Sequence, residues 1–351
     1  MNSEIKINDR LISPNHPPFV IAEMSGNHNQ SIERAFEIID SAAEAGAHAI
    51  KLQTYTANTI TLNVDNDDFR IKDKDSLWSG ENLHTLYDKA KTPWEWHKPI
   101  MKRAEEKGIL CFSSPFDETA IDFLEELNVP AYKIASFENN HIPLIRKAAQ
   151  TGKPLIISTG MANLGELERA VITAKESGCK DLILLKCTST YPAEPINSNI
   201  STIPHLINLF KCQVGLSDHT LGVGVSIGAV ALGASVIEKH LTLSRKDGGV
   251  DSAFSMEPQE FKSLVEETNR VWQSLGKINY GPTESEKKSL MFRRSIFASE
   301  DIESGDLFTS ENIKIVRPGQ GAPPHMIDKI LGKKAKSQFK KGTPIKIENL
   351  F

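Results

Sequence analysis

Short apolar runs that end in polar residues recur along the chain between Phe19 and about Leu275, and each is followed by a segment with helical periodicity. There are eight runs: FVIAE (19–23), HAIKLQ (48–53), ILCFSS (109–114), AYKIAS (131–136), LIIST (155–159), LILLKC (182–187), QVGLS (213–217) and SVIEKH (235–240). The segments with helical periodicity include 32–45, 94–107, 118–127, 164–177, 222–231 and 258–275.

This alternation predicts an α/β fold of the (β/α)8 TIM-barrel class, because strands buried on both faces are apolar without alternation. A doubly wound open sheet is the alternative, but its Gly-rich dinucleotide loop is missing from the sequence. Two long connections, 54–92 and 191–199, follow the second and sixth strands. They leave the side where barrel enzymes place their active sites, so we expect them to cover a substrate.

The pattern changes after Leu275, where the sequence KINYGPTESEKKS is polar. Beyond it come four short strand-like pieces broken by Gly, Pro and Lys pairs: SIFAS, LFTSENIKIV, AKSQF and PIKIENL. We therefore expect a barrel at 1–280, a linker at 281–294 and a small, mostly β domain at 295–351. A domain of this size is too small to carry a deep site alone.

Composition and charge narrow the function classes. The 351 residues are 39% hydrophobic and 25% charged with a formal net charge of −4, so no global field attracts nucleic acid or an anionic membrane. No stretch of about 18 uncharged apolar residues occurs, and the first residues lack the apolar core of a secretory signal, so we expect a cytoplasmic protein. The four cysteines lack CxxC spacing and are expected to be reduced packing residues.

Polar residues stand at the carboxyl ends of the predicted strands, where a barrel carries its site. They are Glu23, Lys51, Gln53, Ser113, Ser114, Lys133, Ser136, Ser158, Thr159, Lys186, Thr188, Ser189, Ser217, His219, Glu238 and His240. His219 and His240 end neighbouring strands, and with Glu23 across the mouth they can bind one divalent cation and leave positions for water and substrate. The other interpretation is that each histidine is a hydrogen-bonded barrel residue.

Two lysines, Lys51 and Lys133, lie within otherwise apolar strands, where an unpaired ammonium costs several kcal/mol. Either a neighbouring carboxylate such as Glu23 or Glu138 compensates them, or a substrate carboxylate or phosphate does, with Ser and Thr hydroxyls completing an anion site. A Schiff-base role for Lys133 or Lys186 is a further alternative.

These positions fall within an ordered series of motifs that resembles the sialic acid (nonulosonic acid) synthase family over essentially the whole chain. The motifs are IAEMSGNHNQS (21–31), KLQTY (51–55), FSSPFD (112–117), PAYKIASFE (130–138), PLIISTGM (154–161), CTSTYP (187–192), GLSDHT (215–220), EKHLT (238–242) and GGVDSAFSMEP (248–258). The terminal region, marked by RPGQG (317–321), resembles that family's antifreeze-protein-like SAF domain.

The resemblance implies a phosphoenolpyruvate-dependent condensation with an N-acetylated amino sugar. It implies that His219 and His240 bind manganese(II), with magnesium or cobalt as alternatives, and that Glu23 handles a proton. It assigns the phosphoenolpyruvate carboxylate to Lys51, Ser114 and Lys133, and its phosphate to Ser136, Ser158, Ser189 and Ser217. It assigns the sugar to Gln53, Glu138, Tyr191, Asp251 and Arg317.

The resemblance also concerns assembly, because family members are dimers in which the small domain caps the neighbour's barrel. Arg317 would then act across the interface of a domain-swapped homodimer. One departure is Ser189, where the family often has Asn, and this makes its phosphate contact the least secure.

Within the family, the chain resembles the branch that makes pseudaminic acid. Asp251 is followed by Ser252, where sialate and legionaminate synthases usually have Asp-His, and TPWEWH (92–97) and SFE (136–138) agree with this branch. The expected acceptor is 2,4-diacetamido-2,4,6-trideoxy-altrose. The other acceptors are N-acetylmannosamine and the legionaminate precursor, and the other function classes are a metal-dependent aldolase or hydrolase and a non-catalytic sugar-binding protein.

Overall fold

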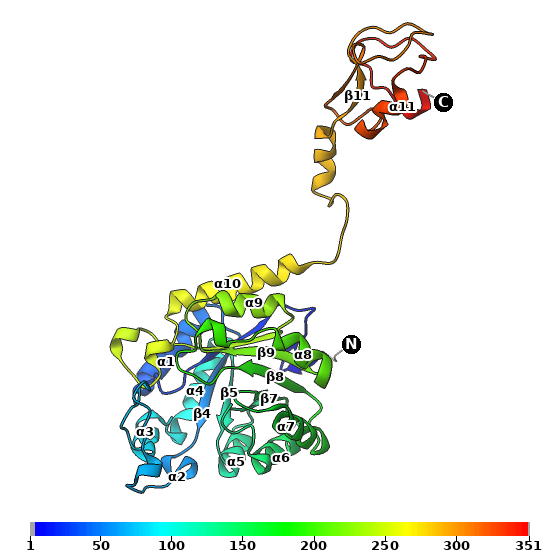
Figure 1. Cartoon of the computed structure of the whole chain (residues 1–351). Coiled ribbons are helices and arrows are strands. Elements are labelled where there is room, and N and C mark those ends of the chain that lie inside the picture. Colours follow the sequence, from blue (N-terminus) through cyan, green and yellow to red (C-terminus); the bar gives the residue numbers. More distant parts are fainter. Residues whose placement is uncertain (1–3, 350–351) are drawn as a thin grey trace. The chain divides into compact units, whose positions relative to one another are not determined.

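A computed structural model of the chain describes residues 4–349. It divides into two compact units, Met1–Gly276 and Lys277–Phe351 (Figure 1). Each unit has its own hydrophobic core.

The first unit is built around a closed barrel of eight parallel strands. In chain order the strands are β3 (Phe19–Glu23), β4 (Ala49–Thr54), β5 (Leu110–Pro115), β6 (Tyr132–Ile134), β7 (Leu155–Ser158), β8 (Leu182–Cys187), β9 (Gln213–Asp218) and β10 (Val236–His240). β10 pairs with both β9 and β3, which closes the barrel. The predicted TIM barrel is confirmed and the open-sheet alternative is wrong.

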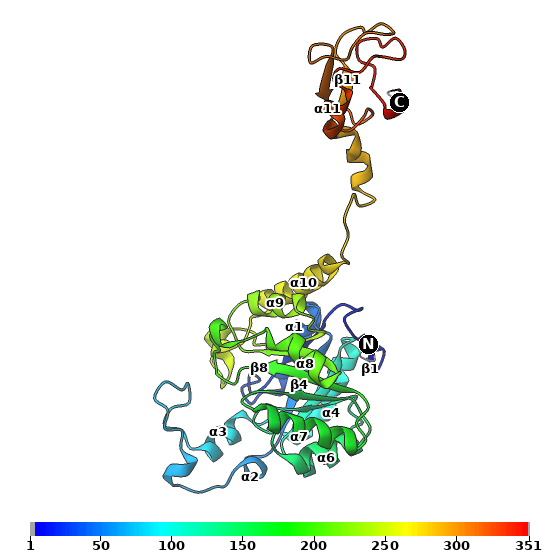
Figure 2. The ribbon, with the colours of Figure 1, turned by 45° about the vertical axis from the view of Figure 1, so that its right-hand side comes forward.

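Helices follow the strands around the outside of the barrel, as Figure 2 shows. They are α1 (Ile32–Glu44), α4 (Trp94–Glu106), α5 (Glu118–Glu126), α6 (Ile142–Gln150), α7 (Leu164–Glu176), α8 (Thr202–Phe210), α9 (Gly224–Ala231) and α10 (Pro258–Leu275). Local sequence sets their starts: the Asn163 side chain accepts a hydrogen bond from the Glu166 amide, and the Glu166 carboxylate accepts one from the Asn163 amide. No helix in residues 4–349 is long and apolar enough to cross a membrane.

Two features of the first unit go beyond the predicted elements. A hairpin of β1 (Ile5–Ile7) and β2 (Arg10–Ile12) precedes the barrel, and its isoleucines belong to the barrel core. The connection from β4 to α4 is not a plain loop, because it contains α2 (Ala57–Ile60), the 3-10 turn η1 (Asp67–Phe69) and α3 (Leu83–Ala90). α2 and η1 are single turns, which carry too little periodicity to be found in a sequence.

The second unit is small and has one antiparallel pair, β11 (Ser295–Ala298) and β12 (Ile313–Val316). The pieces 335–339 and 344–349 contribute isolated bridges rather than full strands, and Leu350 of the predicted PIKIENL strand lies outside the described residues. Its other short elements are the 3-10 turns η6 (Pro324–Met326) and η7 (Ile347–Asn349) and the helix α11 (Ile327–Ile330). The stretch expected as linker contains the 3-10 helix η5 (Glu286–Phe292).

Candidate active site

The predicted site residues of the first unit meet because parallel strands bring their carboxyl ends to one rim of the barrel. In the strand register His240 lies beside Glu23, and Glu23 lies beside Lys51. On the following pair Gln53 lies beside Ser114. The sequence assigned all five to the site, and the barrel sets them on four adjacent strands, β10, β3, β4 and β5.

Four buried ionisable side chains form one network at this rim. The Lys51 ammonium contacts the Glu23 carboxylate and lies 3.8 Å from Glu238 Oε1. The Lys133 ammonium lies 3.4 Å from the same Glu238 oxygen. All four side chains are at most 6% exposed, so two buried lysine charges are opposed by two buried carboxylates.

Burial and neighbouring charge act against each other on these groups. Burial raises the pKa of Glu23 to about 7, although Lys51 partly offsets it. Burial alone would raise the pKa of Glu238, but Lys133 and Lys51 outweigh it and lower that pKa. Burial lowers the pKa of Lys133, whereas Glu23 and Glu238 overcome burial at Lys51 and raise its pKa. A carboxyl group with a pKa near 7 is suited to take or give a proton at neutral pH.

The sequence considered Glu23 or Glu138 as the compensating carboxylate, and Glu23 is the one that contacts Lys51. Glu138 forms no ion pair within residues 4–349, although its burial raises its pKa to about 7. Glu238 opposes both lysines instead, and sequence reasoning gave it no role. Its position two residues before His240 was the available signal, because alternate residues of a strand face the same side.

The two histidine rings lie edge to face, with ring centroids 5.4 Å apart. His219 Nδ1 lies 2.8 Å from the Thr188 carbonyl oxygen, so it carries the proton and Nε2 is left as the electron donor. Burial lowers the pKa of His240 well below its usual range, and His240 Nδ1 has no hydrogen-bond partner in the described residues. Burial alone would lower the pKa of His219, but the hydrogen bond and charge of Cys187 outweigh burial and raise that pKa. Two imidazoles are a donor set that fits a borderline divalent metal.

The two histidines fit a metal ion that keeps open coordination positions, and not a structural metal that protein ligands enclose. Within residues 4–349 no group of three or more His, Cys, Asp or Glu side chains is arranged to hold a metal. Two protein ligands leave the remaining positions to water and substrate, as catalytic metals require.

Serine hydroxyls lie on the opposite strands of the rim. Ser189 Oγ donates to Ser136 Oγ at 2.8 Å, whereas buried Ser158 Oγ has no partner among the described residues. Gly160 lets them approach: its φ is +45°, and a Cβ there would lie 2.5 Å from Ser136 Cβ and 3.0 Å from Ser189 Oγ. These groups form a compact set of donors that matches a phosphate.

Ser114 and Ser217 hydrogen-bond the charged network itself. The Lys51 ammonium donates to Ser114 Oγ at 3.1 Å, and Ser217 Oγ donates to Glu238 at 3.3 Å. Lys186 lies apart from this network. Its ammonium donates to the Cys187 carbonyl oxygen at 2.9 Å, so it is poorly placed for a Schiff base within the network.

The residues predicted to face a sugar come from both units of the chain. Gln53 Nε2 donates to Glu23 Oε1 at 3.1 Å, and Ser25 Oγ donates to the Asp251 carboxylate. The Tyr191 ring lies 4.5 Å from the His219 ring. Burial raises the pKa of Asp251. Arg317 lies in the second unit.

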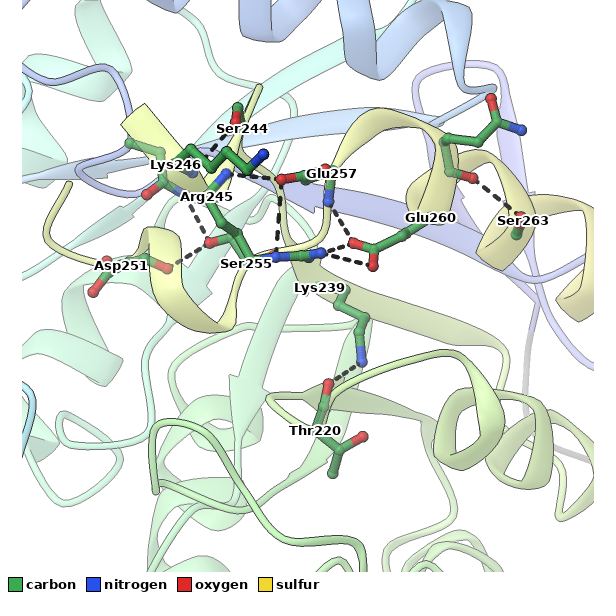
Figure 3. Close-up of polar contacts among 12 residues, drawn as sticks. Thr220, Lys239, Ser244, Arg245, Lys246, Asp251, Ser255, Glu257, Glu260 and Ser263 are labelled. Carbon is green, nitrogen blue, oxygen red and sulfur yellow. Dashed lines mark hydrogen bonds and ion pairs between the residues drawn. The ribbon is translucent and has the colours of Figure 1, made fainter. Parts of the chain in front are cut away.

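A set of hydrogen bonds fixes the segment after β10 around Asp251, as Figure 3 shows. The Arg245 guanidinium donates to both Glu260 oxygens, at 2.5 and 3.0 Å, and to the Ser255 carbonyl oxygen at 3.1 Å. Ser255 Oγ in turn donates to the Asp251 carbonyl oxygen at 2.6 Å. The 3-10 turns η3 (Arg245–Asp247) and η4 (Ser252–Phe254) therefore form a defined wall rather than a loose loop.

Two surface hollows lie away from this rim. One of about 230 Å³ is lined by α7 and α8, and the other, of about 270 Å³, by the β1–β2 turn and the amino ends of β3 and β4. The strand-end residues line neither.

Comparison with known proteins identifies relatives of both units. Residues 38–280 match the NeuB family and residues 293–350 match the SAF domain. A pseudaminic acid synthase of Campylobacter jejuni is 45% identical over 93% of this chain and 95% of that protein. One of Helicobacter pylori is 43% identical over 95% of this chain and 98% of that protein. The SAF match confirms the fold class expected for the terminal region.

A solved structure supports the same assignment. The N-acetylneuraminic acid synthetase of Leptospira borgpetersenii superposes with a TM-score of 0.74 at 35% identity, over 82% of this chain and 95% of that one. The similarity therefore extends through the fold as well as the sequence.

Proposed function

The chain belongs to the NeuB family, and we propose that it is a pseudaminic acid synthase. It condenses phosphoenolpyruvate with 2,4-diacetamido-2,4,6-trideoxy-altrose and water, and releases pseudaminic acid and phosphate. The observation that carries the chemistry is the pair of buried lysines, Lys51 and Lys133, among serine hydroxyls at the strand ends. Two cations so placed suit a small substrate that carries both a carboxylate and a phosphate.

Phosphoenolpyruvate binds to this cation and hydroxyl set. Lys51, Ser114 and Lys133 hold its carboxylate. The hydroxyls of Ser136, Ser158, Ser189 and Ser217 hold its phosphate. The unpartnered Ser158 hydroxyl supports this assignment, because a buried hydroxyl without a partner costs about 1–3 kcal/mol and a substrate oxygen would satisfy it.

His219 and His240 hold a divalent ion, which we propose to be manganese(II), with magnesium or cobalt as alternatives. When bound, the ion supplies a Lewis acid that polarises the aldehyde oxygen of the open-chain sugar. The deep burial of both imidazoles keeps His240 neutral and therefore able to donate an electron pair.

The protein's own groups order the reacting atoms. The lysines and serines fix the methylene carbon of phosphoenolpyruvate against the aldehyde carbon. A carbon–carbon bond forms between them as the C=O π bond opens, and the aldehyde oxygen takes up a proton to become a hydroxyl. Water adds to the former enol carbon and phosphate leaves by cleavage of its carbon–oxygen bond. Glu23 accepts the proton of that water, which its pKa of about 7 permits.

Gln53, Glu138, Tyr191 and Asp251 bind the sugar, and Arg317 reaches its acetamido group. Because Arg317 lies in the second unit, we propose a domain-swapped homodimer in which it acts on the neighbouring barrel. For the domains we propose 1–280 for the synthase barrel, 281–294 for the linker and 295–351 for the SAF domain.

Phosphate release from phosphoenolpyruvate tests the proposal. The assay compares the altro-configured diacetamido sugar with N-acetylmannosamine, each with manganese(II) and with EDTA-treated protein. Release that requires both the altro sugar and metal is expected. Preference for N-acetylmannosamine, or for the legionaminate precursor, would make the protein a sialate or legionaminate synthase. No release with any amino sugar would overturn the proposed activity.

A further inference from the structure

Trp78, on the long connection between β4 and α4, is a second aromatic side chain beside Tyr191. Backbone hydrogen bonds close this connection on itself, from the Ile71 amide to the Glu81 carbonyl oxygen at 3.0 Å and from the Gly80 amide to the Ile71 carbonyl oxygen at 2.8 Å. Trp78 lies inside this closed turn. Its neighbours Leu77 and Ser79 are exposed, whereas Trp78 itself is partly buried.

Trp78 contacts two of the segments that carry predicted sugar residues. Its indole Nε1 donates to the Val250 carbonyl oxygen at 2.9 Å, directly before Asp251. Its ring lies 5.9 Å from the Tyr191 ring at an interplanar angle of 57°. One side chain therefore joins the β4–α4 connection to the loop after β8 and to the segment after β10.

The aromatic contacts continue to the histidine pair. The Tyr191 ring lies 5.1 Å from that of Phe254, and the Phe254 ring lies 4.9 Å from that of His240. Trp78, Tyr191 and Phe254 thus form an aromatic row that runs from the β4–α4 connection to the metal-binding histidines. An aromatic row of this kind offers apolar surface with few hydrogen-bonding atoms.

We propose that Trp78 is a specificity-determining residue whose indole ring forms the apolar wall of the acceptor-sugar subsite. The inference rests on the proposed function, because the favoured acceptor carries methyl groups at C6 and on two acetamido groups. An indole face packs against such methyl groups, whereas the hydroxyls that N-acetylmannosamine has at C4 and C6 lose water there without gaining a partner.

The alternative is that Trp78 only ties the connection to the barrel through its hydrogen bond to Val250. Three substitutions separate the two roles. Trp78→Ala removes both the ring and the donor, Trp78→Phe keeps an aromatic face without the donor, and Trp78→Gln keeps a donor without the face. Trp272 gives a matched control, because its indole also donates to a backbone oxygen, that of Pro14, at 2.9 Å.

The experiment measures phosphate release at varied sugar and varied phosphoenolpyruvate for each variant. Trp78→Ala is expected to lower kcat/KM for the altro sugar by roughly 10- to 200-fold, and N-acetylmannosamine turnover by less. The KM for phosphoenolpyruvate should stay unchanged. Trp78→Phe should recover most of the loss, Trp78→Gln should not, and Trp272→Ala should behave as the unsubstituted protein.

The outcomes distinguish this inference from the proposed function. The proposed function fails if the unsubstituted protein prefers N-acetylmannosamine or uses no amino sugar. The Trp78 inference fails if Trp78→Ala leaves the KM of the preferred sugar unchanged, or if it raises the KM of sugar and phosphoenolpyruvate equally. Recovery by Trp78→Gln rather than by Trp78→Phe would also overturn it, since the hydrogen bond to Val250 would then be the role.

Discussion

Two buried ionic sites share strand β10, one with a partner on β9 and the other with partners on β3, β4 and β6, and they differ in how fully their atoms are satisfied. On one side of the strands the Lys239 ammonium donates to Asp218 at 2.7 Å and to the Thr220 carbonyl oxygen at 2.7 Å. Asp218 also accepts from the Thr220 amide and hydroxyl and from Ser226, so each of its oxygens has two donors. Figure 3 includes the Lys239–Thr220 contact.

The second site begins one residue away. Glu238 opposes Lys51 and Lys133 at longer distances, 3.8 and 3.4 Å, and its Oε2 has no hydrogen-bond partner in the described residues. His240 Nδ1 and Ser158 Oγ share this condition. The cluster around Glu238 is buried like the Lys239–Asp218 pair, but some of its polar atoms lack hydrogen-bond partners in the described residues.

The difference teaches that burial of charge does not by itself mark a functional site. Neighbouring residues of one strand face opposite sides, so Lys239 and Glu238 belong to different environments. A buried pair with every hydrogen bond made supports the fold. A buried cluster with unpaired atoms costs stability and is retained where a ligand completes it.

The largest effect should follow from Glu23 in the incomplete cluster. Glu23→Gln keeps the shape but cannot accept a proton, so turnover should fall by roughly two to four orders of magnitude. Phosphate release under saturating substrates measures it, and circular dichroism checks that the fold is kept. Near-normal turnover would remove Glu23 from the proton transfer.

The complete pair should respond in stability instead. Asp218→Asn leaves the Lys239 ammonium buried opposite a neutral amide, and the free energy of unfolding should drop by about 3–5 kcal/mol. Urea denaturation measures this loss. The control is Asp218→Leu with Lys239→Met, which removes both charges and should recover most of it. A large loss of kcat in folded Asp218→Asn would contradict the division between the two sites.

Arg317 extends the comparison to the second unit. If it binds only the sugar, Arg317→Ala should raise the KM of the sugar by about 10- to 100-fold, the worth of a charged hydrogen bond, and leave that of phosphoenolpyruvate unchanged. Steady-state kinetics at varied concentrations of each substrate measure the two constants. Equal changes in both would indicate misfolding rather than a lost contact.

The smallest effect concerns neutral histidines outside the cluster. Burial lowers the pKa of His28 and of His97 to about 4, and both have hydroxyl partners, Thr92 at 3.1 Å and Thr54 at 2.7 Å. The pKa of each histidine in the folded protein lies below its unfolded value of about 6.5. Its contribution to the free energy of unfolding is therefore complete above about pH 6.5 and is lost as the pH falls toward 4.

At pH 5.5 each of these histidines should cost about 1 kcal/mol of the free energy of unfolding. Urea denaturation at pH 7 and pH 5.5 measures the loss, and His97→Gln should show a shallower dependence. An unchanged slope in His97→Gln would mean that this histidine does not titrate on unfolding.

Much of the fold was predictable because its signals are local. The runs FVIAE and LILLKC and the segment 258–275 match β3, β8 and α10 at both ends, and the other predicted barrel strands differ by one or two residues at one or both boundaries. The β1–β2 hairpin was not predicted, because its strands are three residues long and their burial depends on a barrel formed later in the chain.

The strand-end residues were also predictable as a set, since a (β/α)8 pattern fixes where the carboxyl ends lie. The sequence by itself thus determined the number of barrel strands, the presence of the small terminal domain and the residues available for chemistry. Only the tertiary structure decided that Glu238, and not Glu138, opposes both lysines, that Lys186 lies apart, and that Trp78 meets Tyr191 and Val250. The physical reason is the distance along the chain between interacting residues. Periodicity shows which face of its own helix or strand a residue occupies. Its partners across the barrel or from a long loop depend instead on how elements distant in the sequence pack together.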